Sequence, residues 1–245
     1  MSCPFSSRFV PTFSDTFPLR FPTSPRPPRP HRASRFWSLL CLAVLVAVLG
    51  GCSRSEDGLR IGRSAGHEDR YFTVFQAMGT EVRAVVHTSD RRRAGEWLGA
   101  LPPVVRAVEE QMSTYRPASE INRLNVRGDM ELVPISDSTR DVLRAAKRFT
   151  RLSGGAFDVT YAPLRRLWRR AQERGSPPSP EAIRSALKRV GSEKLLLEAD
   201  GARFASEGVR VDLGGIAKGY AIDRAAEALR AAGARSALVD IGGDI

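Results

Sequence analysis

The stretch VDLGGIAKGY, residues Val211–Tyr220, joins an apolar segment to two glycines and then to a helical pattern. We expect a strand over Val209–Asp212 and a helix from Tyr220 to Ala232. Glycines let backbone amides approach an anion, a helix N-terminus carries partial positive charge, and Lys218 adds a full charge. The stretch matches neither a P-loop nor a dinucleotide fingerprint. It fits either a phosphate-binding turn or a tight strand–helix connection with a surface lysine.

The segments around this turn alternate irregularly between strand and helix patterns. The strands that the pattern predicts are Tyr71–Gln76, Glu81–His87, Lys194–Glu198, Ala202–Ala205 and Ser236–Ile241. It also predicts four helices. The first runs from a cap at Thr88–Asp90 to about Met112, with a break at Pro102-Pro103, and the second runs from a cap at Ser136 or Asp137 to Gly154. The third spans Ala162–Gln172, and the fourth begins at Ser179. In the second of these helices, Val142, Leu143, Ala146 and Phe149 fall on one apolar face. This order predicts an α+β (mixed α/β) fold.

Three further stretches carry residues suited to binding, and each has a plainer structural interpretation. Tyr115, in Met112–Asn125, could stack on a planar ring, while Ser119–Asn122 in the same stretch could simply cap a short helix. In Ser153–Thr160 a glycine pair leads into an expected apolar strand with one acid, Asp158, although a structural turn would suffice. In Asp240–Ile245 two acids flank two glycines, which fits a metal or hydroxyl contact or a hairpin turn.

Composition excludes several classes of protein. The chain has 245 residues, of which 42% are hydrophobic and 27% charged, so it is neither disordered throughout nor a polytopic membrane protein. Three cysteines with no CxxC pair exclude a disulfide scaffold and a zinc motif. The formal net charge is +11, of which residues 1–36 supply +5. The other charges read as Arg and Glu mixed over solvated helix faces, so we expect no nucleic-acid partner.

The N-terminal residues read as an export signal. Phe36–Gly51 holds 16 residues without a charge, after Arg32 and Arg35, and this is shorter than the roughly 20 residues of a membrane span. Leu49–Ser53 resembles the bacterial lipobox, in which the Cys52 thiol takes a lipid; the alternative is an N-terminal anchor with a chance cysteine. We expect a signal peptide with a long Arg/Pro-rich leader over 1–51, a lipidated tether over 52–70 and a folded domain over 71–245. The protein would then be lipid-anchored in the bacterial cell envelope, facing the periplasm or the cell exterior.

Taken in order, five motifs resemble the ApbE family of FAD:protein FMN transferases. They are Met78–Thr80 (MGT), Met112–Pro117 (MSTYRP) with Ser119–Ile121, Gly155–Thr160 (GAFDVT), Asp212–Ala221 (DLGGIAKGYA) with Asp223, and Ile241–Asp244 (IGGD). The resemblance covers Phe72–Ile245. It implies an ApbE-like flavin transferase fold that binds FAD with Mg²⁺. It also implies transfer of FMN to a Thr hydroxyl of a target flavoprotein, with release of AMP. Targets in the family are often subunits of membrane redox complexes.

The resemblance also assigns residues. The positions that match FAD contacts are Met78, Tyr115, Ala156, Phe157, Asp158, Asp212 and Lys218. Gly215 matches a position whose backbone carbonyl ligates the metal. Family members continue past the IGGD motif with further strands and an Asp/Thr motif that supplies metal ligands, so we expect a C-terminally truncated domain with an unpaired edge after Ser236–Ile241. The alternatives to transfer are a non-catalytic FAD-binding lipoprotein and an FAD pyrophosphatase. The resemblance assigns no general base.

Overall fold

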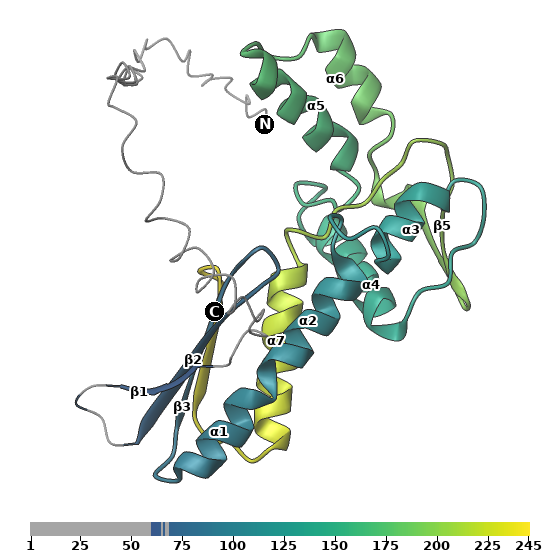
Figure 1. Ribbon diagram of the computed structural model, residues 1–245. Helices are drawn as coiled ribbons and strands as arrows, with labels where there is room; N and C mark the ends of the chain where they lie inside the picture. The colour runs from purple at the N-terminus through teal and green to yellow at the C-terminus, as the bar shows by residue number, and fades with distance from the viewer. Residues whose placement is uncertain (1–59, 65, 67–68) are drawn as a thin grey trace, which may run out of the picture. The chain divides into compact units, whose positions relative to one another are not determined.

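The computed structural model describes residues 60–64, 66 and 69–245, and its elements are labelled in Figure 1. The expected signal peptide over 1–51 and the expected lipid site at Cys52 lie outside the described residues. Within the described part, no helix is both long enough and apolar enough to span a bilayer. The expected α+β class is confirmed, with seven α-helices, one 3₁₀ turn and six strands assigned in the described residues.

Four antiparallel strands form the main sheet, in the order β1 (Arg60–Arg63), β2 (Arg70–Ala77), β3 (Thr80–His87) and β6 (Ala237–Ile241). Side chains of β2 alternate between buried and mostly half-buried positions, as expected when one face of a sheet is better covered, whereas Ala84–Val86 of β3 are buried in succession. The sequence analysis missed β1, which lies inside the expected polar tether. Its four residues pair with Tyr71–Val74 of β2, so tertiary pairing outweighs its weak strand pattern.

The turn between β2 and β3 has an unusual backbone. Ala77 pairs with Thr80, which leaves a connection of two residues. Both have positive φ, 54° at Met78 and 73° at Gly79, as a type I′ hairpin requires. Met78 is the one residue other than glycine with positive φ among the described residues. A side chain with a Cβ is strained in that region.

Three helices contact the sheet: α1 (Arg91–Gly99), α2 (Leu101–Met112) and α7 (Ala217–Ala231). The break between α1 and α2 falls just before Pro102-Pro103, as predicted, and Asp90 caps α1 through the N–H groups of Arg92 and Arg93. Trp97 of α1 donates from Nε1 to the Ala232 carbonyl at 2.8 Å, which ties α1 to the end of α7. The buried core runs through this layer and includes Val82, Leu98 and Leu229.

The remaining elements form the part of the domain whose loops contain the predicted site residues Tyr115 and Asp158 (Figure 1). They are α3 (Glu120–Arg127), α4 (Asp137–Leu152), α5 (Ala162–Arg174), α6 (Pro180–Leu187), the 3₁₀ turn η1 (Ser192–Lys194), and the hairpin of β4 (Leu195–Glu198) and β5 (Gly201–Phe204). The predicted caps at Ser119, Ser136 and Ser179 are confirmed, since each hydroxyl accepts from a backbone N–H in the first turn.

Several local predictions were wrong. Helix α7 begins at Ala217, three residues before the predicted start. The apolar segment after Gly155 folds as turns, with a single-residue bridge at Tyr161. Of the four apolar residues at helical spacing in α4, Val142, Leu143 and Ala146 are buried, while Phe149 is 50% exposed. Helix boundaries and short apolar runs are the features that local sequence patterns determine least.

The predicted strand Val209–Asp212 is also absent: only Arg210 forms a bridge, with Tyr161. The segment is held by that bridge, by the Asp212 N–H donating to the Val159 carbonyl at 2.8 Å, and by the side chain of Asn125. Asn125 Nδ2 donates to the Val211 carbonyl at 2.8 Å, and the Val211 N–H donates to Asn125 Oδ1 at 2.7 Å. Because Val211 is fully buried, these are the bonds that satisfy its backbone there.

We predict that Asn125→Ala lowers the free energy of unfolding by about 2–4 kcal/mol, because it leaves a buried donor and a buried acceptor without partners. Urea denaturation measures the loss. The matched control is Asn122→Ala, which removes an exposed amide whose Nδ2 donates to the Arg116 carbonyl, and which should cost less than about 1 kcal/mol. Equal losses in the two variants would contradict the role given to Asn125.

Candidate functional site

Asp212 stands at the entrance to the Gly214–Gly215 turn, and only 5% of it is exposed. Its Oδ1 accepts from the Gly214 N–H at 2.8 Å, and its Oδ2 accepts from the Arg165 guanidinium. A second nitrogen of that guanidinium donates to the Tyr115 hydroxyl, and its central carbon lies 5.6 Å from the centroid of the Tyr115 ring. Arg165 therefore joins two of the predicted site residues, Tyr115 and Asp212.

The surroundings of Arg165 shift two pKa values. Burial lowers the pKa of the guanidinium, but the hydrogen bond with Tyr115 and the charge of Asp212 outweigh it, so the pKa of Arg165 is raised. Burial and then the charge of Asp212 raise the pKa of Tyr161, with Arg165 acting in the opposite direction. At neutral pH Arg165 is therefore a cation and Tyr161 a neutral phenol.

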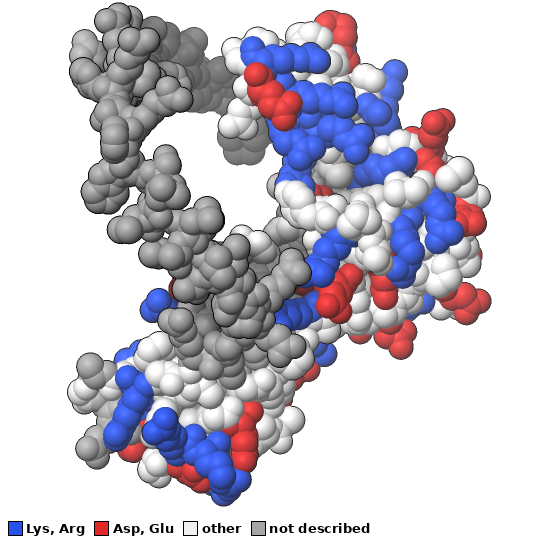
Figure 2. Space-filling model, viewed as in Figure 1, with Lys and Arg blue, Asp and Glu red and all other residues white. Residues whose placement is uncertain are grey.

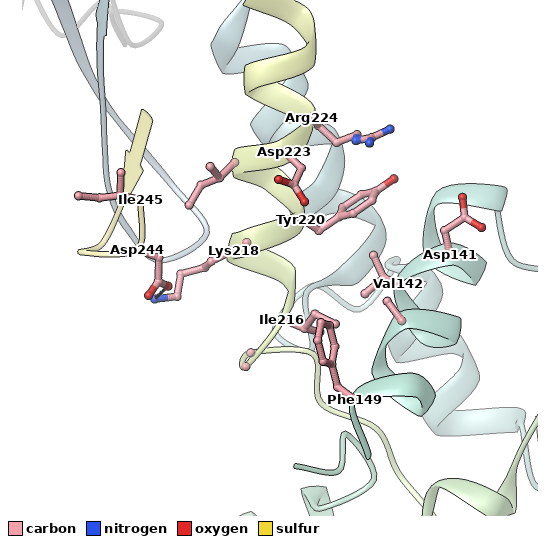
Figure 3. A pocket seen from close by; sticks show the side chains of 15 residues that line it. Asp141, Val142, Phe149, Ile216, Lys218, Tyr220, Asp223, Arg224, Asp244 and Ile245 are labelled. Carbon is pink, nitrogen blue, oxygen red and sulfur yellow. Dashed lines mark ion pairs between the residues drawn. The ribbon is translucent and has the colours of Figure 1, made fainter. Parts of the chain in front are cut away.

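A cavity of about 890 Å³ opens beside the glycine turn (Figure 3). One wall is α4, with Asp141, Val142 and Phe149, and the opposite wall is the turn together with the first half of α7. Asp244 and Ile245 close one side. A cavity of this size matches those that enclose small-molecule cofactors.

The charged groups of this cavity are of both signs. Lys218, in the first turn of α7, points toward Asp244, with Nζ 2.5 Å from Oδ2. No side chain among the described residues caps the N-terminus of α7. Arg224 also lines the wall, and its buried Nε has no hydrogen-bond partner among the described residues. Lys218 and the start of this helix provide donors and positive potential for an anionic ligand, while Arg224, two turns further along α7 and paired with Glu227, adds a second cation to the same wall.

The other end of the cavity is apolar. The rings of Phe149 and Phe157 meet edge to face, with centroids 6.3 Å apart, and Ile216 lies next to Phe149. A second hollow of about 440 Å³, lined by these three residues and Gly215, adjoins the first. A Cβ added to Gly215 would lie 3.2 Å from the Phe157 ring. Glycine at 215 thus lets the polar turn approach the aromatic pair closely.

Predicted site residues therefore fall into two groups. Lys218, Gly215 and Phe157 line the two hollows, while Asp212 and Tyr115 connect to the same turn through Arg165. Met78, Ala156 and Asp158 form the second group; like Tyr115 and Asp212 they line neither hollow, and they are not among the hydrogen-bond partners given above for Arg165.

Asp158 has a structural role in the turn that follows Phe157. Its Oδ1 accepts from the N–H and the hydroxyl of Thr160, and its Oδ2 accepts from the Ser192 N–H at 2.9 Å. Met78 remains in the β2–β3 turn, where Thr80 lies against Gly242 of the Ile241–Asp244 turn. That turn closes by pairing Ile241 with Asp244, so the hairpin interpretation of this stretch is confirmed.

The described residues do not by themselves form a magnesium site. No three His, Cys, Asp or Glu side chains in this part of the chain come together in a way that could hold a metal. The carboxylates of Asp141, Asp223 and Asp244 lie around the cavity without forming such a group. The one predicted ligand, the Gly215 carbonyl, gives a single oxygen where Mg²⁺ takes six, so we derive no step through the metal.

A family model described as "ApbE family" matches residues 78–245. This chain belongs to the ApbE family. The FAD:protein FMN transferase of Treponema pallidum is 30% identical over 220 residues, which is 86% of this chain and 58% of that protein. The same-named protein of Vibrio cholerae is 35% identical over 144 residues, or 58% of this chain and 43% of its own length. The chain thus spans about half the length of the curated relatives that it matches.

Solved structures agree with this assignment. The flavin transferase ApbE from Vibrio cholerae matches with a TM-score of 0.63 and 28% identity over 71% of this chain and 58% of that one. The ApbE protein of Thermotoga maritima matches with a TM-score of 0.63 and 31% identity, over 71% of this chain and 57% of that one. The predicted ApbE-like fold is therefore confirmed.

Sequence reasoning missed the residue that organises this part of the ApbE-like domain. Arg165 lies in an arginine-rich helix and looked like one of several surface charges. The spacing of four residues between Tyr161 and Arg165 could have indicated that Arg165 belongs to the site. At the start of a helix this spacing places both residues on one face, next to the Asp158–Thr160 turn. What no local pattern reveals is its partner Asp212, which is 47 residues away in sequence.

We predict an energetic coupling between Arg165 and Asp212. In a double-mutant cycle with Arg165→Leu and Asp212→Asn, urea denaturation should give a coupling of about 1 kcal/mol, kept small because the Arg165 side chain is 38% exposed. The control cycle pairs Asp212→Asn with Arg169→Leu, one turn further along α5, and its coupling energy should be about zero. The ion pair would lose its assigned role if both cycles gave the same value.

Proposed function

We propose that this chain is an FAD:protein FMN transferase. In that reaction a Thr hydroxyl of the target attacks the FMN phosphorus, so that an oxygen–phosphorus bond forms, the bond to AMP breaks, and the Thr proton is lost. Curated relatives bear this activity in their names. Phosphoryl transfer depends mainly on positioning and on stabilising charge, which are tasks that fixed donors perform.

The observation that carries the proposal is the position of Lys218. Its ammonium stands at the uncapped start of α7, beside the Gly214–Gly215 turn and on the wall of the large cavity. A pyrophosphate bound there would accept hydrogen bonds from Lys218 and backbone N–H groups, while the apolar end at Phe149 and Phe157 suits a planar ring. Tyr115, 74% exposed under the Arg165 guanidinium, offers another stacking surface.

One observation favours a second function. The described residues assemble no group of metal ligands, and a chain that binds FAD without a completed metal site would store or present the flavin. Hydrolysis of FAD to FMN and AMP is the third outcome to distinguish. Mg²⁺ belongs to the proposal as a requirement to be tested, with the Gly215 carbonyl as the ligand that the resemblance implies.

The deciding experiment incubates the full chain with FAD, with Mg²⁺ or EDTA, and with a redox-complex subunit that carries an acceptor Thr. The products to measure are AMP and flavin that stays on the subunit through denaturing electrophoresis. Covalent flavin that requires the acceptor Thr supports transfer. AMP with free FMN would replace the proposal by a pyrophosphatase, and bound FAD without AMP would replace it by a flavin-binding protein.

We predict that Lys218→Gln lowers the rate of AMP release by about tenfold to a hundredfold, because one fixed cation next to the pyrophosphate is lost. Arg230→Gln, on the exposed last turn of the same helix, is the control and should keep the rate within about twofold. Chromatographic measurement of AMP gives both rates. Unchanged AMP release in Lys218→Gln would remove Lys218 from the site.

We also propose that the protein is a lipid-anchored component of the bacterial cell envelope, facing the periplasm or the exterior. The support is the sequence pattern at Leu49–Ser53 with the apolar segment before it. Radiolabelled palmitate should enter the wild-type protein and be absent from Cys52→Ala. Equal labelling of the two would overturn the anchor.

A further inference from the structure

The excess positive charge of the domain is concentrated on the hairpin of α5 and α6. Residues 162–189 hold eight Arg and Lys residues against two acids, a net charge of +6. Residues 37–245 taken together also have a net charge of +6, so the rest of that range is balanced. The sequence analysis expected these charges to be mixed with acids over solvated faces. Figure 2 instead shows Lys and Arg side chains gathered over the region where Figure 1 places α5 and α6.

Nearly all of these cations face solvent. Arg165 is the partly buried one, held by Tyr115 and Asp212. The exposed ones are Arg166, Arg169, Arg170, Arg174, Arg184, Lys188 and Arg189. The two acids of the hairpin, Glu173 and Glu181, are exposed as well, and Glu181 pairs with Arg184 at 2.6 Å. The hairpin therefore presents a strong positive potential to anything that approaches it.

Two large apolar side chains lie among these cations. Trp168 of α5 is 52% exposed and Leu187 of α6 is 48% exposed. The two helices pack more against each other than against any other described element, and each buries only one alanine, Ala171 and Ala186. Little of the part of the chain that the structure describes covers the outer surface of the hairpin, which leaves Trp168 and Leu187 exposed to a partner.

We propose that the α5–α6 hairpin docks on the surface of an anionic phospholipid bilayer. The arginines and Lys188 bind headgroup phosphates, while Trp168 and Leu187 enter the boundary between headgroups and acyl chains. Tryptophan prefers that boundary because its ring is apolar and its N–H is polar. A nucleic acid takes up a leucine side chain only by unstacking its bases, whereas a bilayer buries Leu187 and Trp168 without that cost, which favours lipid over the other polyanions that a basic surface attracts.

This docking goes beyond the proposed transferase activity and does not depend on it. It also differs from anchoring at Cys52, since a lipid chain holds the protein near a membrane without fixing which face meets the lipid. Each basic residue near an anionic surface strengthens attachment by about fivefold. The contribution is screened by salt beyond a Debye length of about 8 Å at physiological ionic strength.

Protease protection tests the docking on the full chain. The protein is bound to vesicles of phosphatidylcholine alone or of phosphatidylcholine and phosphatidylglycerol in equal parts, and trypsin cleavage within residues 165–189 is followed by mass spectrometry. We expect cleavage there to slow about tenfold on the anionic vesicles and to recover at high salt. Cleavage after Arg127, an exposed residue of α3, is the internal reference and should not change. Equal hairpin cleavage on both vesicles would overturn the proposal.

Matched variants separate local docking from net charge. Arg166→Gln with Arg170→Gln should weaken attachment about 25-fold, at about fivefold for each charge, and so remove the protection of the remaining sites. The control pair is Arg91→Gln with Arg235→Gln, which removes the same charge from exposed positions on α1 and on the α7–β6 loop and should leave protection unchanged. If both pairs reduced protection equally, net charge alone would explain the binding and the docking face would be wrong.

A second measurement follows the apolar contact. The difference in tryptophan emission between the wild type and Trp168→Phe isolates the signal of Trp168, and it should shift to shorter wavelength on anionic vesicles. A Trp168 signal that stays at its aqueous wavelength would contradict insertion. Duplex DNA at the same phosphate concentration completes the test, because protection by DNA without protection by vesicles would make the hairpin a nucleic-acid surface instead.

Discussion

Two hydrogen bonds between the Asn125 amide and the Val211 backbone fix the segment that leads into the glycine turn. Together with the Arg210–Tyr161 bridge and the Asp212 N–H donated to the Val159 carbonyl, they hold this segment extended, so the residues that follow enter the turn from a fixed direction. Asp212 continues the constraint, because it accepts from Gly214 on one oxygen and from Arg165 on the other. The position of Lys218, the cavity wall and the exposed Tyr115 ring all depend on this short succession of contacts.

The cavity combines requirements that are usually hard to meet together. A charged pyrophosphate needs donors and positive potential, whereas a flavin ring needs apolar contact. In the proposed binding mode the turn brings the two together, since Gly215 has no side chain to separate the start of α7 from Phe157. A single larger residue at 215 would displace the ring beside it, which explains in physical terms why glycine suits this position.

Much of the fold could be predicted from local sequence, because its signals act over a few residues. Asp90, Ser119, Ser136 and Ser179 cap helices where the pattern placed them. The failures share a cause, which is that the deciding partner lies far along the chain. Strand β1 depends on β2, the extended segment at Val211 depends on Asn125, and Arg165 gains its role only when Asp212 folds next to it. The motifs identified the family correctly, but they did not show which matched residues face the cavity and which, like Asp158, stabilise a turn.

The separation of charge between the α5–α6 hairpin and the balanced remainder makes the domain an electric dipole. In a non-uniform field such a molecule experiences a torque as well as a force, so it turns before it touches anything. Approaching a negatively charged surface, it arrives with the hairpin leading, and encounters in other orientations become rarer. Raising the ionic strength weakens this alignment together with the attraction. The asymmetric charge distribution therefore determines which face of the domain approaches a negatively charged surface first, whatever that surface is.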